Sequence, residues 1–429
     1  MTGSANPAGT SPGEAGAAGT GSAGNGSARN GSAPATRPTA ATAAARIEEE
    51  LAGMALIDHH AHLPVTADLP GDRAGPFEAY LTESDRPPAP GLTPFDSQLG
   101  TAVRRWCAPV LDLEPFPAAA GYLARRAELG GREATRRFLL SSGTSGFLID
   151  TGYGTSSGGP AAPTTELAEL HDLSGAEVHE VVRLETVAER LAGLGTTAAA
   201  FPDRFAAALE DETRRATAVK SVIAYRFGLD FDPAPPSRQE VVAAAGTWLR
   251  EIEGGAAPRV SDPVLLRHLL WAGVQRGLPV QVHTGFGDPD LQLHRCDPAL
   301  MTGFLSRAEP HGVPVMLLHC YPYHRSAGYL AQVFPHVFCD VGLAVNHTGA
   351  RAAAVVAECL ELAPFGKVLF SSDACGPAEL HFLGALLWRR ALGRVLGAWV
   401  QDGDWDAGEA ARVAALIGHG NARRVYRLA

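Results

Sequence analysis

The sequence predicts an α/β protein built on a closed, TIM-like (β/α)8 barrel. Three observations support this fold class. Short apolar segments of β-type sequence alternate with helix-like segments eight times along the chain. Histidine and aspartate fall at the ends of these segments, and the carboxyl ends of barrel strands form the active-site rim. The chain has 429 residues, and barrels of about 250 residues or more remain single domains.

Two kinds of region flank or interrupt the predicted barrel. Residues 1–45 are almost all Ala, Gly, Ser, Thr, Asn and Pro, a composition that buries too little apolar surface to fold, so we expect a disordered low-complexity tail. The barrel domain is then 46–429, starting with a short helix near Ala44. Within it, 66–145 is too long for a simple connection, and we expect helical insertions on the carboxyl-terminal face that act as a lid.

Each predicted strand is a short run rich in β-branched residues that ends in a polar residue and precedes a helix-like stretch. The eight runs are Ala55–Asp58, Gly146–Asp150, Val178–Glu185, Val219–Arg226, Pro279–His283, Val313–His319, His336–Asp340 and Lys367–Asp373. A doubly wound open sheet would show a similar rhythm. Four histidines placed within or at the ends of apolar runs favour the barrel.

Composition excludes several classes of partner. The balance of 36 Lys+Arg against 46 Asp+Glu gives a net charge of −10, which argues against nucleic acid and anionic membranes as partners. No apolar stretch reaches 18 residues, and the six cysteines include no CxxC pair. We therefore expect a cytoplasmic protein that acts on a small-molecule substrate, and homo-oligomerisation is left open.

The first candidate metal ligands are His60 and His62. Residues i and i+2 of a strand project to the same face, so both imidazoles would point into the barrel mouth and could chelate one cation. The pair alone is weak evidence, because 15 histidines in a chain of this length produce about half an HxH motif by chance.

Three further candidates end later strands: His283, His319 and Asp373. A lone histidine in such a place is more often a hydrogen-bonded core residue, whereas a buried carboxylate needs a cation. Taken together, imidazoles and a carboxylate at one end of a barrel suit a divalent metal ion, zinc first and manganese, iron or cobalt as alternatives. Such an ion lowers the pKa of bound water, and Asp373 could accept the proton.

These residues also carry a resemblance to a known family. The segment Asp58–His62, the two later strand histidines, Ser371–Asp373 and the closing Gly420–Tyr426 resemble, in this order, the amidohydrolase superfamily and specifically its amidohydrolase-2 branch, over about residues 54–429. More narrowly, Val280–Asp290 and Val219–Gly228 look like the amidohydrolase module associated with glutamine-synthetase-like proteins.

The resemblance implies a distorted barrel with a metal held by His60, His62, His283 and Asp373. It makes His319 either a further ligand or the group that polarises the scissile carbonyl. Superfamily members with two metals carry a carboxylated lysine at the end of strand 4. Here we expect Lys220 near the beginning of that strand, so the expectation is one metal ion, and a register shift of several residues would let Lys220 bridge two.

Arg183 and Arg226 are the candidate substrate-binding residues, because each is expected at the end of a strand. A guanidinium can hold a substrate carboxylate with two parallel hydrogen bonds. The alternative, an ion pair with Glu185 or Asp230, is weighed equally.

The function expected from these residues and the resemblance is metal-dependent hydrolysis of an amide C–N bond. A γ-glutamyl-type amide is the expected substrate, on the strength of the family association and the arginines. The alternative within enzymes is a non-oxidative decarboxylase of the same branch, because the two reactions use nearly identical metal sites. A metal-stabilised, non-catalytic partner of a ligase-like protein is a third interpretation.

Overall fold

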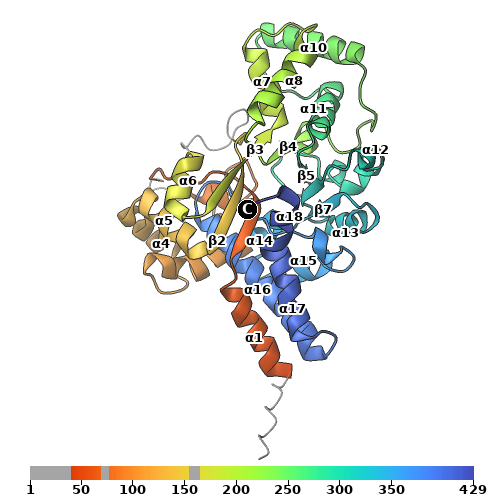
Figure 1. Cartoon of the computed structure of the whole chain (residues 1–429). Helices are drawn as coiled ribbons and strands as arrows, with labels where there is room; N and C mark the ends of the chain where they lie inside the picture. The colour runs from red at the N-terminus through yellow and green to blue at the C-terminus, as the bar shows by residue number, and fades with distance from the viewer. Residues whose placement is uncertain (1–39, 69–76, 154–164) are drawn as a thin grey trace, which may run out of the picture. The chain divides into compact units, whose positions relative to one another are not determined.

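The fold is organised around seven parallel strands that form one sheet in the order β1-β2-β3-β4-β5-β6-β7 (Figure 1). The computed structural model describes residues 40–68, 77–153 and 165–429. The strands are β1 (Leu56–Ala61), β2 (Thr144–Asp150), β3 (Glu177–Arg183), β4 (Ala218–Ser221), β5 (Val280–Thr284), β6 (Val315–His319) and β7 (Val337–Cys339). Because every strand is parallel to its neighbours, all carboxyl ends meet at one face of the sheet.

The eighth predicted strand joins the two edges of this sheet without forming a regular ladder. Val368 pairs with Cys339 of β7, and the amide of Leu369 donates to the carbonyl oxygen of Cys339 at 3.1 Å. On the other side, the amide of His59 donates to the carbonyl oxygen of Phe370 at 3.1 Å. The amide of Asp373 donates to the carbonyl oxygen of His60, also at 3.1 Å. The predicted barrel fold is confirmed, with an irregular eighth segment.

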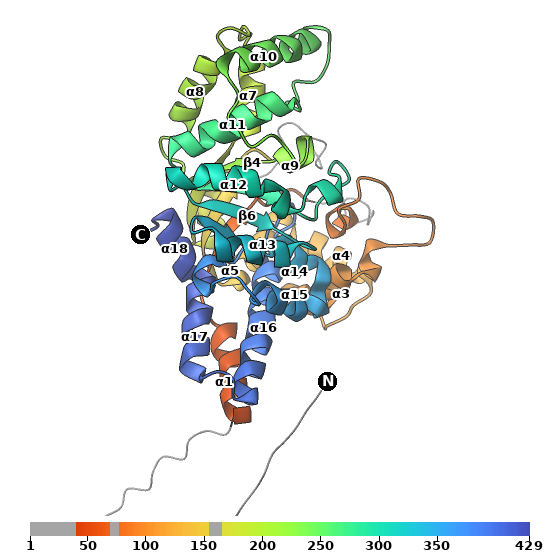
Figure 2. The same cartoon turned by 90° about the vertical axis from the view of Figure 1, so that its right-hand side faces the viewer.

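Helices surround the sheet and continue beyond it (Figure 2). Helices α1, α16 and α17 lie side by side at one end in both views, and α7, α8, α10 and α11 gather at the other. The helices are α1 (Ala40–Ala52), α3 (Gln98–Ala102), α4 (Ala119–Leu129), α5 (Gly131–Ser142), α6 (Leu167–Ser174), α7 (Leu184–Gly193), α8 (Phe201–Glu212), α9 (Ile223–Arg226), α10 (Arg238–Glu253), α11 (Pro263–Arg276), α12 (Thr302–Ala308), α13 (His324–Val333), α14 (Gly342–Thr348), α15 (Ala352–Cys359), α16 (Glu379–Asp402), α17 (Ala407–Ala415) and α18 (Asn421–Tyr426).

Strand alternation divides the apolar residues into two layers. Alternate residues of the strands build a small interior cluster, which also contains Ala422, Val425 and Tyr426 of α18. The strand members of this cluster are Ile57, Leu148, Val181, Ala218, Met316, Leu318, Phe338 and Leu369. The residues between them, such as Phe147 and Val282, belong to the larger core that the helices cover. The C-terminal helix therefore packs against the apolar interior of the barrel.

Several sequence-based boundaries were wrong. The fourth strand, expected to run to Arg226, ends at Ser221, and 223–226 form α9. The third strand ends at Arg183 rather than Glu185. The helix expected near Ala118–Leu140 is broken at Gly130, where φ is +80°. A left-handed backbone is easy only for glycine, so the break falls there.

The predicted tail and insertion are described only in part. Residues 1–39 lie outside the described part of the chain, and residues 40–45 belong to α1. Residues 69–76 of the insertion also lie outside it. The remaining insertion is anchored to the barrel domain, because buried Arg126 of α4 donates to Glu379 of α16 at 2.7 Å.

None of the helices in the described residues is long and apolar enough to cross a membrane.

Candidate metal centre

The carboxyl ends of the strands bring together the histidines and aspartate that the sequence singled out. His60 lies on β1, His62 directly follows it, and Asp373 closes the eighth segment. The Nε2 atoms of His60 and His62 lie 3.2 and 3.3 Å from Asp373 Oδ1. The site is shielded from solvent, with 0% of the His60 side chain and 11% of the Asp373 side chain exposed. These three residues therefore form one compact, buried cluster.

The two later histidines join this cluster from the opposite side of the barrel. His319 ends β6, and its Nε2 lies 3.4 Å from Asp373 Oδ2. His283 lies on β5, and its ring centroid is 4.8 Å from that of His319. The ring of His319 is in turn 5.4 Å from that of His60. Four imidazoles thus surround one carboxylate, although they come from strands far apart in the sequence.

The donor set fits a divalent metal ion, because several of its buried atoms have no hydrogen-bond partner. These atoms are His283 Nε2, both ring nitrogens of His319 and Asp373 Oδ1. Buried polar atoms are nearly always paired in proteins, so a group of orphans at one point indicates a ligand. Neutral imidazole nitrogens and a carboxylate oxygen are the ligands of zinc and of neighbouring transition metals.

Among the described residues, two sets of three side chains have ligand atoms close enough to share an ion. One set is His60, His319 and Asp373, and the other is His60, His62 and Asp150. His283 belongs to neither set. In the sequence, Asp150 is simply the polar residue that ends the second predicted strand, and a polar residue is expected there because a turn follows. Asp150 could have been identified as a candidate ligand from its position at the carboxyl end of β2, because β2 lies next to β1.

Burial sets the charge states at the site. Removal from water lowers the pKa of His60 to about 3 and that of His283 well below its ordinary value, and Lys220 adds to both shifts. Burial alone would raise the pKa of Asp373, but His319, His60 and His62 hold it well below its usual range. At neutral pH the imidazoles of His60 and His283 are therefore neutral and the Asp373 carboxylate is ionised, which are the forms that bind metals.

The backbone at the carboxyl ends is unusual for residues other than glycine. The φ angles of His319, Cys320 and Asp373 are +68°, +57° and +50°. Such angles cost free energy in non-glycine residues and occur often at functional sites, where the surrounding structure holds them. Two of the three residues belong to the cluster, so the strain lies at the site itself.

Comparison with known proteins agrees with this geometry. A family model described as Amidohydrolase matches residues 159–428, more than half of the chain. The protein belongs to the amidohydrolase family. A candidate metal-dependent hydrolase from Lactobacillus casei ATCC 334 has a similar structure, with a TM-score of 0.75, 27% identity, and coverage of 89% of this chain and 97% of that one. The resemblance to the amidohydrolases is thereby confirmed.

Other relatives are more distant or only partly matched. Protein fluG of Emericella nidulans is 32% identical over 286 residues, which cover 62% of this chain and 33% of that protein. The chain thus spans about a third of this relative's length. A uronate isomerase from Bacillus halodurans C-125 shares the fold, with a TM-score of 0.60, 13% identity, and coverage of 91% of this chain and 98% of that one.

In this amidohydrolase, Lys220 lies at the site and not away from it. Because β4 ends at Ser221, Lys220 is its penultimate residue, which corrects the expectation that it lies near the beginning of the strand. Its Nζ is 3.2 Å from His60 Nε2, and the side chain is buried. Burial lowers the pKa of Lys220 to about 8, although Asp150 and Asp373 oppose the shift.

The two arginines are paired with carboxylates other than those expected. Arg183 does end β3, and it holds Asp150 through Nε and Nη2, the latter at 2.6 Å. Arg226 lies in α9, not at a strand end, and its Nη2 is 3.3 Å from Glu189. The buried Nη1 of Arg226 has no partner among the described residues. A substrate-binding role for either arginine stays a prediction.

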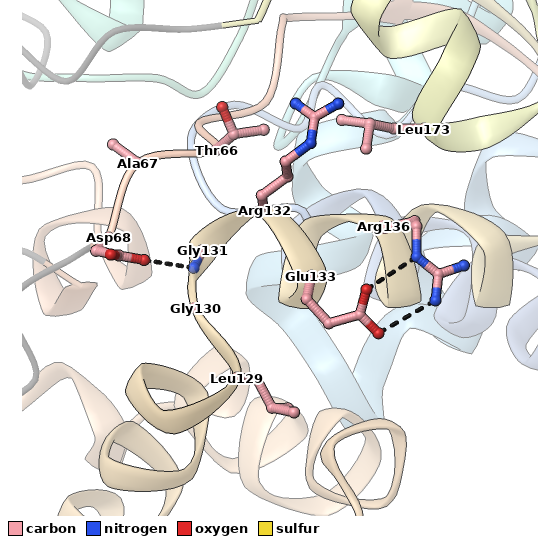
Figure 3. A pocket seen from close by; sticks show the side chains of 10 residues that line it. All are labelled: Thr66, Ala67, Asp68, Leu129, Gly130, Gly131, Arg132, Glu133, Arg136 and Leu173. Atoms are coloured by element: carbon pink, nitrogen blue, oxygen red, sulfur yellow. Dashed lines mark hydrogen bonds and ion pairs between the residues drawn. The ribbon is translucent and has the colours of Figure 1, made fainter.

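A cavity at the start of α5 is lined by none of the residues of the metal cluster (Figure 3). It measures about 510 Å³ and is lined by Thr66, Ala67, Asp68, Leu129, Gly130, Gly131, Arg132, Glu133, Arg136 and Leu173. Figure 3 shows that Asp68 accepts from the amide of Gly131, at 2.6 Å, and that Glu133 pairs with Arg136. We do not assign the catalytic function to this cavity.

Proposed function

We propose that this amidohydrolase cleaves the C–N bond of a small-molecule amide, of the γ-glutamyl type, with one divalent metal ion that is zinc in preference to manganese, iron or cobalt. The observation that carries the proposal is the cluster of His60, His62, His283 and His319 around Asp373, with buried ligand atoms left unpaired. The similarity to a candidate metal-dependent hydrolase supports it.

The metal ligands in this proposal are His60, His62, His283 and Asp373. A divalent ion bound there supplies a Lewis acid and lowers the pKa of a water molecule towards neutrality. Lys220 lies beside His60 and offers a ligand for a second ion only if its amine becomes carboxylated, so one ion per chain is proposed.

The catalytic residues are Asp373 and His319. Asp373 is ionised, so its carboxylate can accept a proton from the attacking water and later deliver it to the departing amine. His319 Nε2 faces the same carboxylate and has no hydrogen-bond partner among the described residues. As an N–H donor it can stabilise negative charge on the carbonyl oxygen of the substrate.

Arg226 is the better of the two candidates for a substrate carboxylate. Its Nη1 keeps free hydrogen-bond donors, whereas the guanidinium of Arg183 is held by Asp150. A carboxylate on the substrate would take the partner that Arg226 lacks, which is why a γ-glutamyl-type amide is preferred to a neutral one.

We place the reaction in the cytoplasm, because all six cysteines are free and most are buried, as expected for a reducing compartment.

The test is a product assay on zinc-loaded protein with a panel of γ-glutamyl amides, neutral amides and aromatic carboxylic acids. Release of free amine that depends on zinc supports the proposal, and a preference for the γ-glutamyl substrates supports the substrate class. Release of carbon dioxide from the acids, with no amine from any amide, would show the decarboxylase instead. No product from any compound would favour the non-catalytic role.

A further inference from the structure

We propose that Gln281 and Tyr426 are positioning residues that set the tautomer of the metal ligand His60. Through them the C-terminal helix α18 supports the metal centre. The inference rests on the metal site proposed above. It follows from a chain of buried hydrogen bonds whose donor and acceptor directions can be assigned one after another.

The first step is the orientation of the Gln281 side chain on β5. Its Nε2 lies 2.7 Å from the carbonyl oxygen of His59. A carbonyl oxygen only accepts hydrogen bonds, so this end of the amide must be the NH2 group. The other end, Oε1, then faces His60 Nδ1 at 2.8 Å. An amide oxygen only accepts, so His60 Nδ1 carries the hydrogen.

The second step concerns the other ring nitrogen of His60. A neutral imidazole has one hydrogen, so Nε2 has a free lone pair. This atom is the one that points at the cluster, 3.2 Å from both Asp373 Oδ1 and Lys220 Nζ. Metal-binding histidines commonly donate their second ring N–H to an oxygen, which orients the ring and raises its basicity. Gln281 supplies that oxygen here.

The third step fixes Gln281 itself through Tyr426 of α18. Gln281 Nε2 donates to the Tyr426 hydroxyl at 2.9 Å. The hydroxyl hydrogen is then free to point at His59 Nδ1, also at 2.9 Å. His59 Nε2 in turn lies 2.9 Å from Asp340 Oδ2. Gln281, Tyr426 and His59 each accept a hydrogen bond on one side and donate one on the other, and the Asp340 carboxylate accepts at the end.

The hydrogen-bond chain ends at Asp340, which also binds the backbone of His319, a second residue of the metal cluster. Asp340 Oδ1 accepts the backbone amides of His319 and Gly342, at 2.9 and 2.8 Å. The same hydrogen-bond chain therefore connects Tyr426 to the side chain of His60 and to the backbone of His319. Both of these residues contact Asp373, one with each carboxylate oxygen.

Burial makes this arrangement rigid. Gln281, His59 and Asp340 are 0% exposed and Tyr426 is 5% exposed, so water cannot replace a lost partner at little cost. Helix α18 is itself held in place, because Asn421 Nδ2 donates to the carbonyl oxygens of Val368 and Phe365, at 2.7 and 2.8 Å.

The test compares zinc affinity of the full chain and two variants by competition with a zinc indicator. Gln281→Met keeps the length of the side chain and removes both polar atoms, and we expect zinc to bind about 10- to 100-fold more weakly. Tyr426→Phe removes one hydroxyl, and we expect a smaller but measurable loss. The matched control is Tyr122→Phe, because the Tyr122 hydroxyl is equally buried and bonds Glu379 away from the site.

A second measurement separates positioning from general loss of stability. Ring nitrogen-15 chemical shifts of metal-free protein with labelled histidine report the tautomer of His60, once its signals are assigned with a His60→Gln variant. We expect the Nδ1–H form in the wild type and a mixture in Gln281→Met. This measurement needs no bound zinc, so the effect of Gln281 on the His60 tautomer is tested separately from the proposed function.

Two results would overturn the inference. One is an unchanged His60 tautomer in Gln281→Met. The other is a loss of zinc affinity in Gln281→Met and Tyr426→Phe no greater than in Tyr122→Phe.

Discussion

Two groups of buried polar residues lie side by side in the barrel, and they differ in how completely they are hydrogen-bonded. In the first group, His59, Gln281, Asp340 and Tyr426, every polar side-chain atom has a partner. In the second group, which surrounds Asp373, His283 and His319 have ring nitrogens with none. A saturated group holds the fold, whereas an unsaturated one has donors and acceptors left for a ligand.

The same residue types therefore play different parts a few ångströms apart. His59 and His60 are adjacent in sequence, and both are fully buried. Both ring nitrogens of His59 are engaged by Asp340 and Tyr426, which excludes it as a ligand. His60 has Nδ1 engaged by Gln281, whereas its Nε2 points into the cluster, beside Lys220 Nζ and Asp373 Oδ1. The difference teaches that the direction of the second ring nitrogen, towards the saturated group or towards Asp373, separates a structural histidine from a candidate ligand when both are buried.

The sharpest test of this comparison is Asp373→Asn. The variant keeps the size of the side chain but loses the charge that accepts a proton, so we expect kcat to fall by about 100- to 10,000-fold. The measurement is the rate of amine release at saturating substrate and zinc. An activity equal to that of the wild type would remove Asp373 from the chemistry and favour a role in binding a partner.

The next largest effect is expected for metal content in a His60→Ala/His62→Ala variant. Protein purified without chelator should carry about one divalent ion per chain, and the variant severalfold less, because two of its proposed ligands are gone. Metal analysis of both proteins checks this. Unchanged content in the variant would exclude β1 from the site, and two ions per chain in the wild type would point to a carboxylated Lys220.

The two groups should also respond differently to the same substitution. Asp340→Asn puts an NH2 group where a carboxylate accepts from His59 and two backbone amides, so we expect the metal-free protein to lose about 2 kcal/mol of unfolding free energy. Asp373→Asn should cost less, because Asp373 Oδ1 has no hydrogen-bond partner. Urea unfolding of both metal-free variants measures the difference, and equal losses would contradict the comparison.

The smallest expected effect is on the pH dependence of stability, and it concerns His268 of α11, a histidine outside the metal cluster. His268 Nε2 is also unpaired, but its ring lies against Phe201 and Phe205, and burial lowers its pKa from 6.5 to about 4. The unfolded chain takes up a proton first as the pH falls, so this residue's contribution to stability is lost between about pH 6.5 and 4. His268→Phe should flatten the pH dependence of stability in that range.

Metal content provides the control for His268→Phe. It should stay at the wild-type value, because His268 belongs to neither of the two sets of possible metal ligands found among the described residues. A loss of metal in this variant would show that an unpaired imidazole outside the cluster can bind the ion.

The sequence by itself determined the fold class and most of the candidate metal cluster. Parallel strands put their carboxyl ends at one face, so polar residues that end apolar runs must converge there, and His60, His62, His319 and Asp373 do. Local pattern was enough for these residues because strand periodicity is a local property.

Only the tertiary structure decided the place of Lys220, the partners of Arg183 and Arg226, and the pairing of Gln281 with His60. The apolar run from Val219 continues past the residue where β4 ends, so the sequence offers no sign that α9 begins at Ile223. Which side chains meet across the barrel depends on strand register and on the docking of α18. Both depend on packing between residues that are far apart in the sequence, such as Tyr426 and Gln281.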